Sequence, residues 1–405
     1  MTPGRGPRVC LIVIFLVLVG VVAPSQIVLD LRQGEMPEIV DLFRQTPTRG
    51  NLRRLESDLE SKCRLAQAVR PSVQYARFLL FQDAGDQALL GRDGWFFYRP
   101  AVQYLVEPVR SVPVRAYPET PHGVTTNEDD IFAAIISFRD DLAKRGIKLL
   151  VMPAPNKSSV YPEMLTVRAT GTGGTPALGG ETSGPSRGRL GYINPTTREV
   201  LATLKQAGVE IVDLFEAYTE ARRKEKDIEY YLAQDSHWSP AGIRLAAQAV
   251  ARRLLDLGWV EKGPITYGLK PVTVRRYGDV LKMIRVPQIE QRYVPEWTEC
   301  LQVENAWTGE VYQDDPNSPV LVLGDSFLRI FERDEPGGGG FIAHLAYNLG
   351  FGLTSIVNDG GASTLVRQQL ARKPALLKGK KVVVWEFVER DIRFGTEGWQ
   401  VIPLP

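Results

Sequence analysis

The sequence predicts an α/β fold with a mostly parallel sheet, and three apolar segments support that prediction. Residues 147–152, 319–323 and 381–387 are rich in valine, leucine and other large apolar residues, as buried strands are. Helix-like spacing of apolar residues separates these segments, which is the alternation that produces a parallel sheet sandwiched by helices. In such sheets ligands bind beyond the carboxyl ends of the strands, so we expect the functional site at that edge.

The bulk composition excludes several classes of function. The chain has 405 residues and a formal net charge of +2, which gives no reason to expect a nucleic-acid partner. It has only three histidines, its three cysteines match no zinc motif, and no glycine-rich phosphate loop follows a strand. We therefore predict neither a metal nor a cofactor. Cys63 and Cys300 either form a disulfide in an oxidising compartment or stay unpaired as buried thiols.

The amino terminus carries an apolar run that follows Arg5 and Arg8. Counted to Leu29, the run reaches the ~20 residues that span a bilayer; counted to Ala23, it is typical of a signal peptide. Pro24 gives a poor cleavage context, so we favour an uncleaved anchor with the body of the chain outside the cytoplasm. The predicted parts are an anchor at 1–30, a juxtamembrane helical segment at 31–85 and one domain at 86–405 with a Gly-rich insertion at 169–191.

Local patterns predict further elements within the large domain. Residues 91–98 have the Asp-Gly turn and aromatic run of a hairpin entering a buried strand. Asn127 is placed to cap a helix over 131–142, and Ser239 with Pro240 starts another helix. We expect residues 258–318 to form an irregular, aromatic-rich lobe beside the site.

The strand at 319–323 leads into Gly324-Asp325-Ser326, which places a serine hydroxyl at a strand-to-helix turn. The backbone N–H groups of the following helix lie beside such a serine and stabilise an oxyanion. The alternative is a serine that only caps the helix. We expect Asp325 to hold the turn by hydrogen bonding.

A second stretch offers the groups that would activate this serine. Asp235 and His237 lie in a loop directly before the helix that Ser239 starts, where side chains are aimed into a site. Acyl transfer at serine needs a base and a group that fixes the tautomer of that base. His237 and Asp235 fit these roles, and the alternative is a surface histidine beside a helix-capping aspartate.

The two stretches together resemble the alginate O-acetyltransferase family of AlgJ/AlgX type. The resemblance rests on Asp-x-His-Trp-Ser-Pro-x-Gly at 235–242, which precedes Gly-Asp-Ser-Phe at 324–327, and on segments 91–98, 151–157 and 385–390. It implies an SGNH-hydrolase-like, flavodoxin-like domain whose catalytic blocks are circularly permuted. It also implies that Ser326 is acetylated, that His237 is base and then acid, and that Asp235 orients it.

The resemblance further implies a polysaccharide acceptor and an acetyl donor supplied by a polytopic membrane O-acyltransferase. It also implies a catalytic domain in the periplasm. The N-terminal helix holds this domain at the cell inner membrane, or signal cleavage releases it. No carbohydrate-binding module follows the last predicted strand, so the architecture is closer to the membrane-anchored AlgJ type. Asn358 and Gly360 are candidates for the second oxyanion donor, and Lys157, Tyr161 and Arg390 for glycan contacts. A carbohydrate acetylesterase and a non-catalytic glycan-binding subunit of an export complex are the alternatives.

Overall fold

The computed structural model describes residues 23–34, 63–106, 130–170 and 191–405, together with isolated residues before position 63. The chain divides into two units, Met1–Asp83 and Ala84–Pro405. The first contains helices α2 (Ala23–Arg32) and α5 (Arg64–Phe81). Across the described ranges, no helix has both the length and the apolar content that a membrane span needs. Half of the predicted anchor at 1–30 lies outside the described residues.

The second unit is built on a five-stranded sheet in the order β4-β3-β9-β7-β8, with all neighbours parallel, as the sequence predicts. Its strands are β3 (Lys148–Ala154), β4 (Glu210–Ile211), β7 (Val320–Gly324), β8 (Thr354–Val357) and β9 (Val382–Val388). Their carboxyl ends lie at one edge of the sheet because the strands are parallel.

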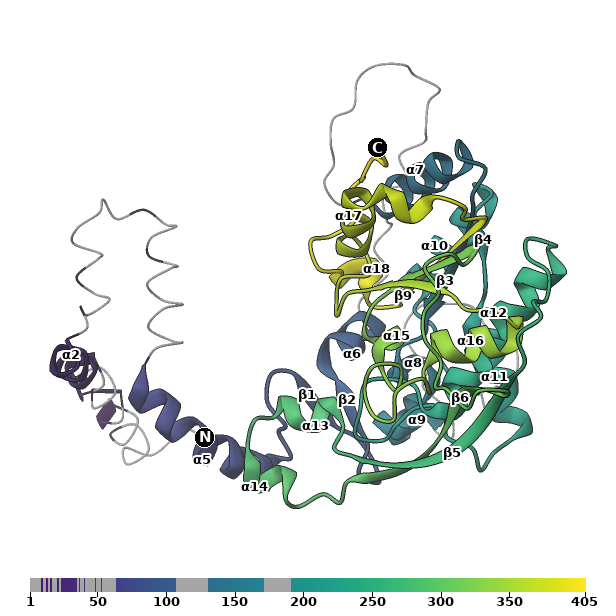
Figure 1. The fold of residues 1–405 in the computed structure, drawn as a ribbon. Helices are drawn as coiled ribbons and strands as arrows, with labels where there is room; N and C mark the ends of the chain where they lie inside the picture. The colour runs from purple at the N-terminus through teal and green to yellow at the C-terminus, as the bar shows by residue number, and fades with distance from the viewer. Residues whose placement is uncertain are drawn as a thin grey trace, which may run out of the picture. The chain divides into compact units, whose positions relative to one another are not determined.

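Helices cover both faces of this sheet (Figure 1). Alternate strand residues point to opposite faces, so Val384 and Val388 join one core while Val383 and Trp385 join the other. The first core is completed mainly by α12 (Pro240–Asp256) and α16 (Phe341–Leu349), and the second by α7 (Ile131–Ala143), α10 (Pro195–Gln206) and α17 (Leu365–Arg372). The remaining helices of this unit are α6 (Arg99–Val106), α8 (Lys157–Val160), α9 (Pro162–Leu165), η2 (Val167–Thr170), α11 (Leu214–Lys224), α13 (Asp279–Met283), α14 (Pro287–Glu290), α15 (Ser326–Arg329), η3 (Pro374–Leu377) and α18 (Asp391–Phe394).

Two antiparallel hairpins flank the sheet. The predicted turn at 91–98 joins β1 (Ala88–Leu90) to β2 (Phe96–Tyr98). The prediction of an irregular lobe at 258–318 is wrong, because β5 (Tyr267–Arg276) and β6 (Glu296–Asn305) pair over ten residues each. Pro271 and the many charged residues of this segment hide the strand pattern from a reading of the sequence.

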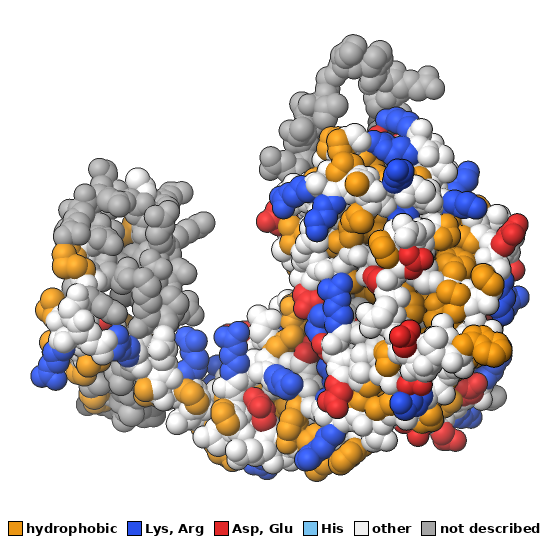
Figure 2. Space-filling model, viewed as in Figure 1, with side chains coloured by type: hydrophobic (Ala, Val, Ile, Leu, Met, Phe, Trp, Pro, Cys, Tyr) orange, Lys and Arg blue, Asp and Glu red, His pale blue; other side chains and the backbone are white. Residues whose placement is uncertain are grey.

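Three smaller expectations can be compared with the structure. The side chain of Asp130, and not Asn127, caps α7 by accepting from the backbone N–H groups of the first helical turn; Asn127 lies outside the described residues. Cys63, in the first unit, and Cys300, in the second, are both buried free thiols in the structure. Most of the predicted insertion at 169–191 lies outside the described residues. Basic and acidic side chains are both scattered over the visible surface in Figure 2, in keeping with the near-zero net charge.

Candidate active site

Ser326 lies where the sequence predicts, at the turn between β7 and the one-turn helix α15. Asp325 caps that helix, with its Oδ1 accepting from Phe327 N–H at 2.9 Å. Ser326 is the first residue of α15, so its backbone N–H has no acceptor within the helix. The side chain is partly exposed, which leaves the hydroxyl accessible at the sheet edge.

His237 approaches this hydroxyl from the loop before α12. Its Nε2 lies 2.8 Å from Ser326 Oγ, and its Nδ1 lies 2.6 Å from Asp235 Oδ1. Both His237 and Asp235 are buried. The loop is held by the bridge between Tyr231 and Trp238 and by the capping bond from Gly242 N–H to Ser239 Oγ. Two segments nearly ninety positions apart in the chain therefore meet in one hydrogen-bonded series.

Two residues that the sequence did not single out complete the surroundings of Asp235. Arg276 Nη2 donates to Asp235 Oδ2 at 2.9 Å, and the backbone N–H of Asp279 donates to the same oxygen at 3.1 Å. The Asp279 carboxylate accepts from Ser236 N–H and Ser236 Oγ, at 2.6 Å each, and lies 3.5 Å from His237 Nδ1. Both oxygens of Asp235 are therefore occupied.

These contacts set the protonation of the pair. Burial alone would raise the pKa of Asp235, but the neighbouring His237 and Arg276 hold it far below its usual range. Burial alone would lower the pKa of His237, but Asp235 and then Asp279 raise it above its ordinary value. The carboxylate is therefore ionised, and it stabilises the imidazolium that forms when His237 accepts a proton.

The described residues contain one cluster with the composition of a metal site. Ligand atoms of Asp235, His237 and Asp279 lie within 4.8 Å of one another. The short hydrogen bond between Asp235 and His237, and the two bonds from Ser236 to Asp279, already account for these atoms. This arrangement suits proton transfer better than metal binding.

Lys157 does not occupy the position expected of a glycan contact. Its side chain is buried, and Nζ donates to the backbone carbonyls of Phe96 at 2.6 Å, Ala233 at 2.6 Å and Asp235 at 3.0 Å. The ammonium also lies 4.8 Å from the centre of the Trp95 ring. We therefore correct the prediction: Lys157 ties the hairpin β1–β2 to the loop that carries Asp235, because all its donors are used internally.

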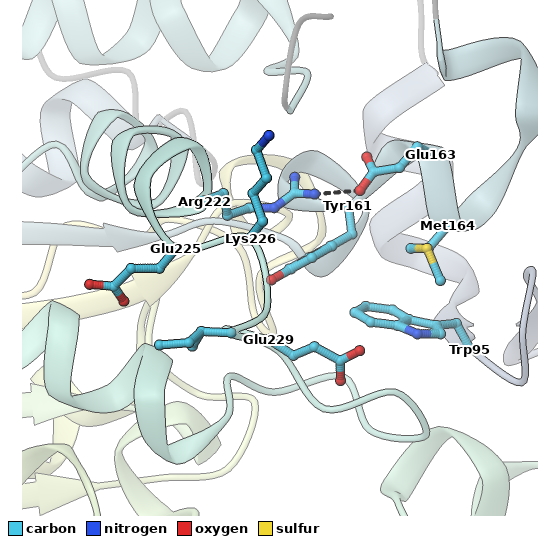
Figure 3. Close-up of a pocket in the computed structure, with 9 residues that line it drawn as sticks. Trp95, Tyr161, Glu163, Met164, Arg222, Glu225, Lys226 and Glu229 are labelled. Atoms are coloured by element: carbon cyan, nitrogen blue, oxygen red, sulfur yellow. Dashed lines mark hydrogen bonds and ion pairs between the residues drawn. The ribbon is translucent and has the colours of Figure 1, made fainter.

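Tyr161 is also mostly buried, but its ring lines a pocket of about 330 Å³ (Figure 3). Its hydroxyl accepts from Tyr230 N–H at 2.8 Å, and the Arg222 guanidinium lies 3.8 Å from the ring centre. In Figure 3 the Arg222 side chain is paired with Glu163 at the rim of the same pocket. The hydroxyl of Tyr161 is therefore engaged within the protein, and the ring is the part of it that faces the pocket.

The other candidates lie at the carboxyl edge of the sheet. Asn358 follows β8, and its backbone N–H donates to Gly324 O at 3.0 Å, directly beside the serine turn. Gly360 is exposed two residues farther on. Arg390 follows β9 and lies 5.0 Å from the centre of the Tyr98 ring. The topology thus brings Asn358 next to the turn of Ser326, and its role as an oxyanion donor stays a prediction.

The chain matches a known protein family over the region that contains this site. The model of the SGNH hydrolase-like domain of the acetyltransferase AlgX matches residues 183–389, which is just over half of the chain. The chain belongs to this family. Its matched region contains Asp235, His237 and Ser326, and it ends at Glu389, just after β9.

Alignments with individual proteins cover more of the chain than the family model does. Proteins named "Probable alginate O-acetylase AlgJ" from Pseudomonas syringae pv. tomato and Pseudomonas aeruginosa are 22% and 25% identical to the chain. The alignments cover 77% and 79% of this chain, and 71% and 74% of those proteins. The solved O-acetyltransferase domain of Pseudomonas putida AlgJ superposes with a TM-score of 0.55 at 20% identity, over 75% of this chain and 91% of that one. This last likeness supports the α/β fold, and the family model supplies its description as SGNH hydrolase-like.

The AlgX-family match also divides the predicted site residues. The serine, histidine and aspartate lie inside the matched region, as do Arg276 and Asp279, whereas Lys157 and Tyr161 lie before it. Arg276 and Asp279 escaped the sequence analysis because they belong to the segment that we expected to be irregular. The local signal is limited to Gly278-Asp279, which forms the cap and the first residue of the short helix α13.

Proposed function

We propose that this chain is a polysaccharide O-acetyltransferase that works through an acetyl-serine intermediate. Ser326 Oγ attacks the acetyl carbonyl of the donor, while His237 Nε2 accepts the hydroxyl proton. The tetrahedral intermediate collapses to acetyl-Ser326, and His237 returns the proton to the leaving group of the donor. The observation that carries this proposal is the 2.8 Å separation of Nε2 and Oγ, with Asp235 on the opposite ring nitrogen.

In the second half of the reaction a sugar hydroxyl attacks the acetyl carbonyl. His237 accepts the proton of that hydroxyl, and Ser326 Oγ leaves and takes the proton back. Negative charge forms on the carbonyl oxygen in both halves. The Ser326 backbone N–H, which has no acceptor within α15, is the first candidate to stabilise it, and Asn358 beside Gly324 is the second.

The acceptor is a hydroxyl of an exported polysaccharide. Its support is the family, described as acetyltransferase, together with relatives named for the acetylation of alginate. Direct assay with alginate and with other exopolysaccharides identifies the polymer that this chain acetylates. We further propose that the domain works in the periplasm, held at the inner membrane by the apolar run at 9–29, and receives acetyl groups from a membrane O-acyltransferase.

Product analysis with an activated acetyl ester and a panel of oligosaccharides tests this proposal. We expect acetylated oligosaccharide from the wild-type chain, and a loss of about 10⁴-fold or more in Ser326→Ala. Ser137→Ala, in helix α7, is the matched control and should leave the rate unchanged. Release of free acetate alone would indicate an esterase. Unchanged polymer acetylation in Ser326→Ala would instead leave a non-catalytic glycan-binding role.

A further inference from the structure

Three buried carboxyl groups lie behind the serine turn, and the proposed reaction uses none of them. Glu386 is on β9, and its side chain points to the same face of the sheet as Val384 and Val388. Asp325 and Asp391 follow the carboxyl ends of β7 and β9. Glu386 and Asp325 are fully buried, and Asp391 is 5% exposed. A buried carboxylate is costly unless it is paired, so this group needs a physical explanation.

Glu386 is in direct contact with the serine turn. Its Oε2 accepts from the backbone N–H of Asp325 at 3.0 Å, one residue before the nucleophile. The same oxygen lies so close to Gly324 that a Cβ at position 324 would overlap it. The glycine of the Gly-Asp-Ser motif therefore makes room for the carboxyl group of Glu386.

The remaining carboxyl oxygens of Glu386 and Asp325 show where a proton is needed. Among the described residues, Glu386 Oε1 and Asp325 Oδ2 are both buried without a hydrogen-bond partner, while the other oxygen of each accepts from a backbone N–H. The bond from Asp325 N–H to Glu386 Oε2 keeps the two buried carboxyl groups close together, and each acts on the pKa of the other. Two ionised carboxylates at this separation would repel one another, whereas one shared proton turns both unpaired oxygens into a donor and an acceptor.

We propose that Glu386 is a positioning residue that stays protonated at neutral pH and donates from Oε1 to Asp325 Oδ2 while its Oε2 accepts from Asp325 N–H. These two bonds hold the backbone and the side chain of Asp325 together. Asp325 in turn accepts from the N–H of Phe327. These hydrogen bonds together fix the turn that presents Ser326 to His237. This role rests on the proposed acetyl-serine chemistry, to which it adds the group that fixes the nucleophile.

The electrostatics of the surrounding groups agree with this assignment. Burial, and next the charge of Asp325, raise the pKa of Glu386 well above its ordinary value. Burial also raises the pKa of Asp325, but Arg390, at the end of β9, and His237 oppose that effect. Burial raises the pKa of Asp391 to about 7. Glu386 has no such cation among its principal interactions, so it is the member of the pair that keeps the proton.

Substitution by glutamine and by alanine separates this role from a general structural one. Glu386→Gln keeps both bonds, because the amide oxygen accepts from Asp325 N–H and the amide N–H donates to Asp325 Oδ2. We expect its kcat with an activated acetyl ester to stay within about 3-fold of wild type, with the alkaline fall of the pH profile weakened. Glu386→Ala loses both bonds and should lose about 10²-fold in kcat, because the nucleophile is misplaced. Equal losses in two folded variants would show that the carboxylate itself is needed and would overturn the proposal.

An infrared measurement tests the proton without relying on activity. The spectrum of wild type minus that of Glu386→Gln at neutral pH should contain the carbonyl stretch of one protonated carboxylic acid, and a difference spectrum without this band would refute the proposal. The matched control is Glu332→Gln, since burial raises the pKa of Glu332 to about 8 as well. That variant should lose an infrared band but keep the wild-type pH profile. An inactive wild type would overturn only the proposed acetyl transfer, because the infrared result stands by itself.

Discussion

Arg276 Nη2 donates to Asp235 Oδ2 at 2.9 Å, so the carboxylate that orients His237 is itself paired with a cation. The arginine comes from the last residue of β5, and the aspartate comes from the loop before α12. The second oxygen of Asp235 is bonded to His237. Asp235 is thus fixed from two sides, and the hairpin β5–β6 becomes part of the support of the site.

Removal of this cation should slow the reaction and move its pH dependence. In Arg276→Met we expect kcat/KM to fall by about 10–10²-fold, because Asp235 loses one of the hydrogen bonds that fix its position. Activity needs neutral His237, so it falls as the pH drops through the pKa of that group. Without Arg276 no cation offsets the negative charge of Asp235, so the pKa of His237 should rise. The acid limb of the profile should therefore move to higher pH. The check is a pH profile of kcat/KM with an activated acetyl ester.

The neighbouring arginine supplies the control for this experiment. Arg275 is exposed, and its guanidinium lies 5.6 Å from the centre of the Trp297 ring on the opposite face of the hairpin. Arg275→Met should keep the wild-type profile. Equal effects of the two substitutions would mean that hairpin stability, and not the charge on Asp235, governs the rate.

Removal of the Asp279 charge should shift the acid limb of the pH profile in the direction opposite to the shift in Arg276→Met. Its carboxylate lies 3.5 Å from His237 Nδ1 and contributes to the raised pKa of that residue. Asp279→Asn keeps an acceptor for Ser236 N–H but removes the negative charge. The pKa of His237 should fall, and the acid limb should therefore move to lower pH. Glu299→Gln, an exposed change on β6, is the control; an acid limb that stays in place in Asp279→Asn would contradict the role of this charge.

Lys157 should matter for stability more than for glycan affinity. Lys157→Met removes three hydrogen bonds and leaves buried carbonyl oxygens without their donor, at a cost of about 3 kcal/mol in the free energy of unfolding. Chemical denaturation measures this loss. Lys205→Met, at an exposed position of α10, should change stability by less than about 0.5 kcal/mol. A weaker affinity for oligosaccharide at unchanged stability would restore the glycan-binding interpretation.

The parts of the site that the sequence predicts are those with a local pattern. An apolar run before Gly324-Asp325-Ser326 specifies a strand and a turn, and Ser239-Pro240 specifies the start of the helix behind His237. The parallel arrangement then accounts for Asn358, because neighbouring strands end at one edge.

The parts that the sequence does not predict depend on distant partners. The acceptors of Lys157 Nζ lie 61 to 78 positions away along the chain, so nothing around Lys157 indicates that it is buried. Arg276 reaches Asp235 only because β5 pairs with β6, and Pro271 and the charged residues obscure that pairing. Glu386 gives no signal either, because a strand residue reveals its contacts only when the neighbouring strand is known.

Gly278 offers a test of how closely the loop of Asp235 is fitted to the hairpin β5–β6. It directly precedes α13, and a Cβ at this position would overlap the backbone of Gln234 and Asp235. In Gly278→Ala the backbone must shift, and with it the carboxylate that orients His237. We expect kcat with an activated acetyl ester to fall by about 10²-fold, since such displacements act directly on the reacting geometry. Gly268→Ala is the matched control, because the nearest heavy atom there is 4.0 Å away, and it should keep the wild-type rate. Equal activity of Gly278→Ala and Gly268→Ala would contradict this prediction. It would mean that the loop of Asp235 can move without loss of rate, although Arg276 and Asp279 hold Asp235 by hydrogen bonds.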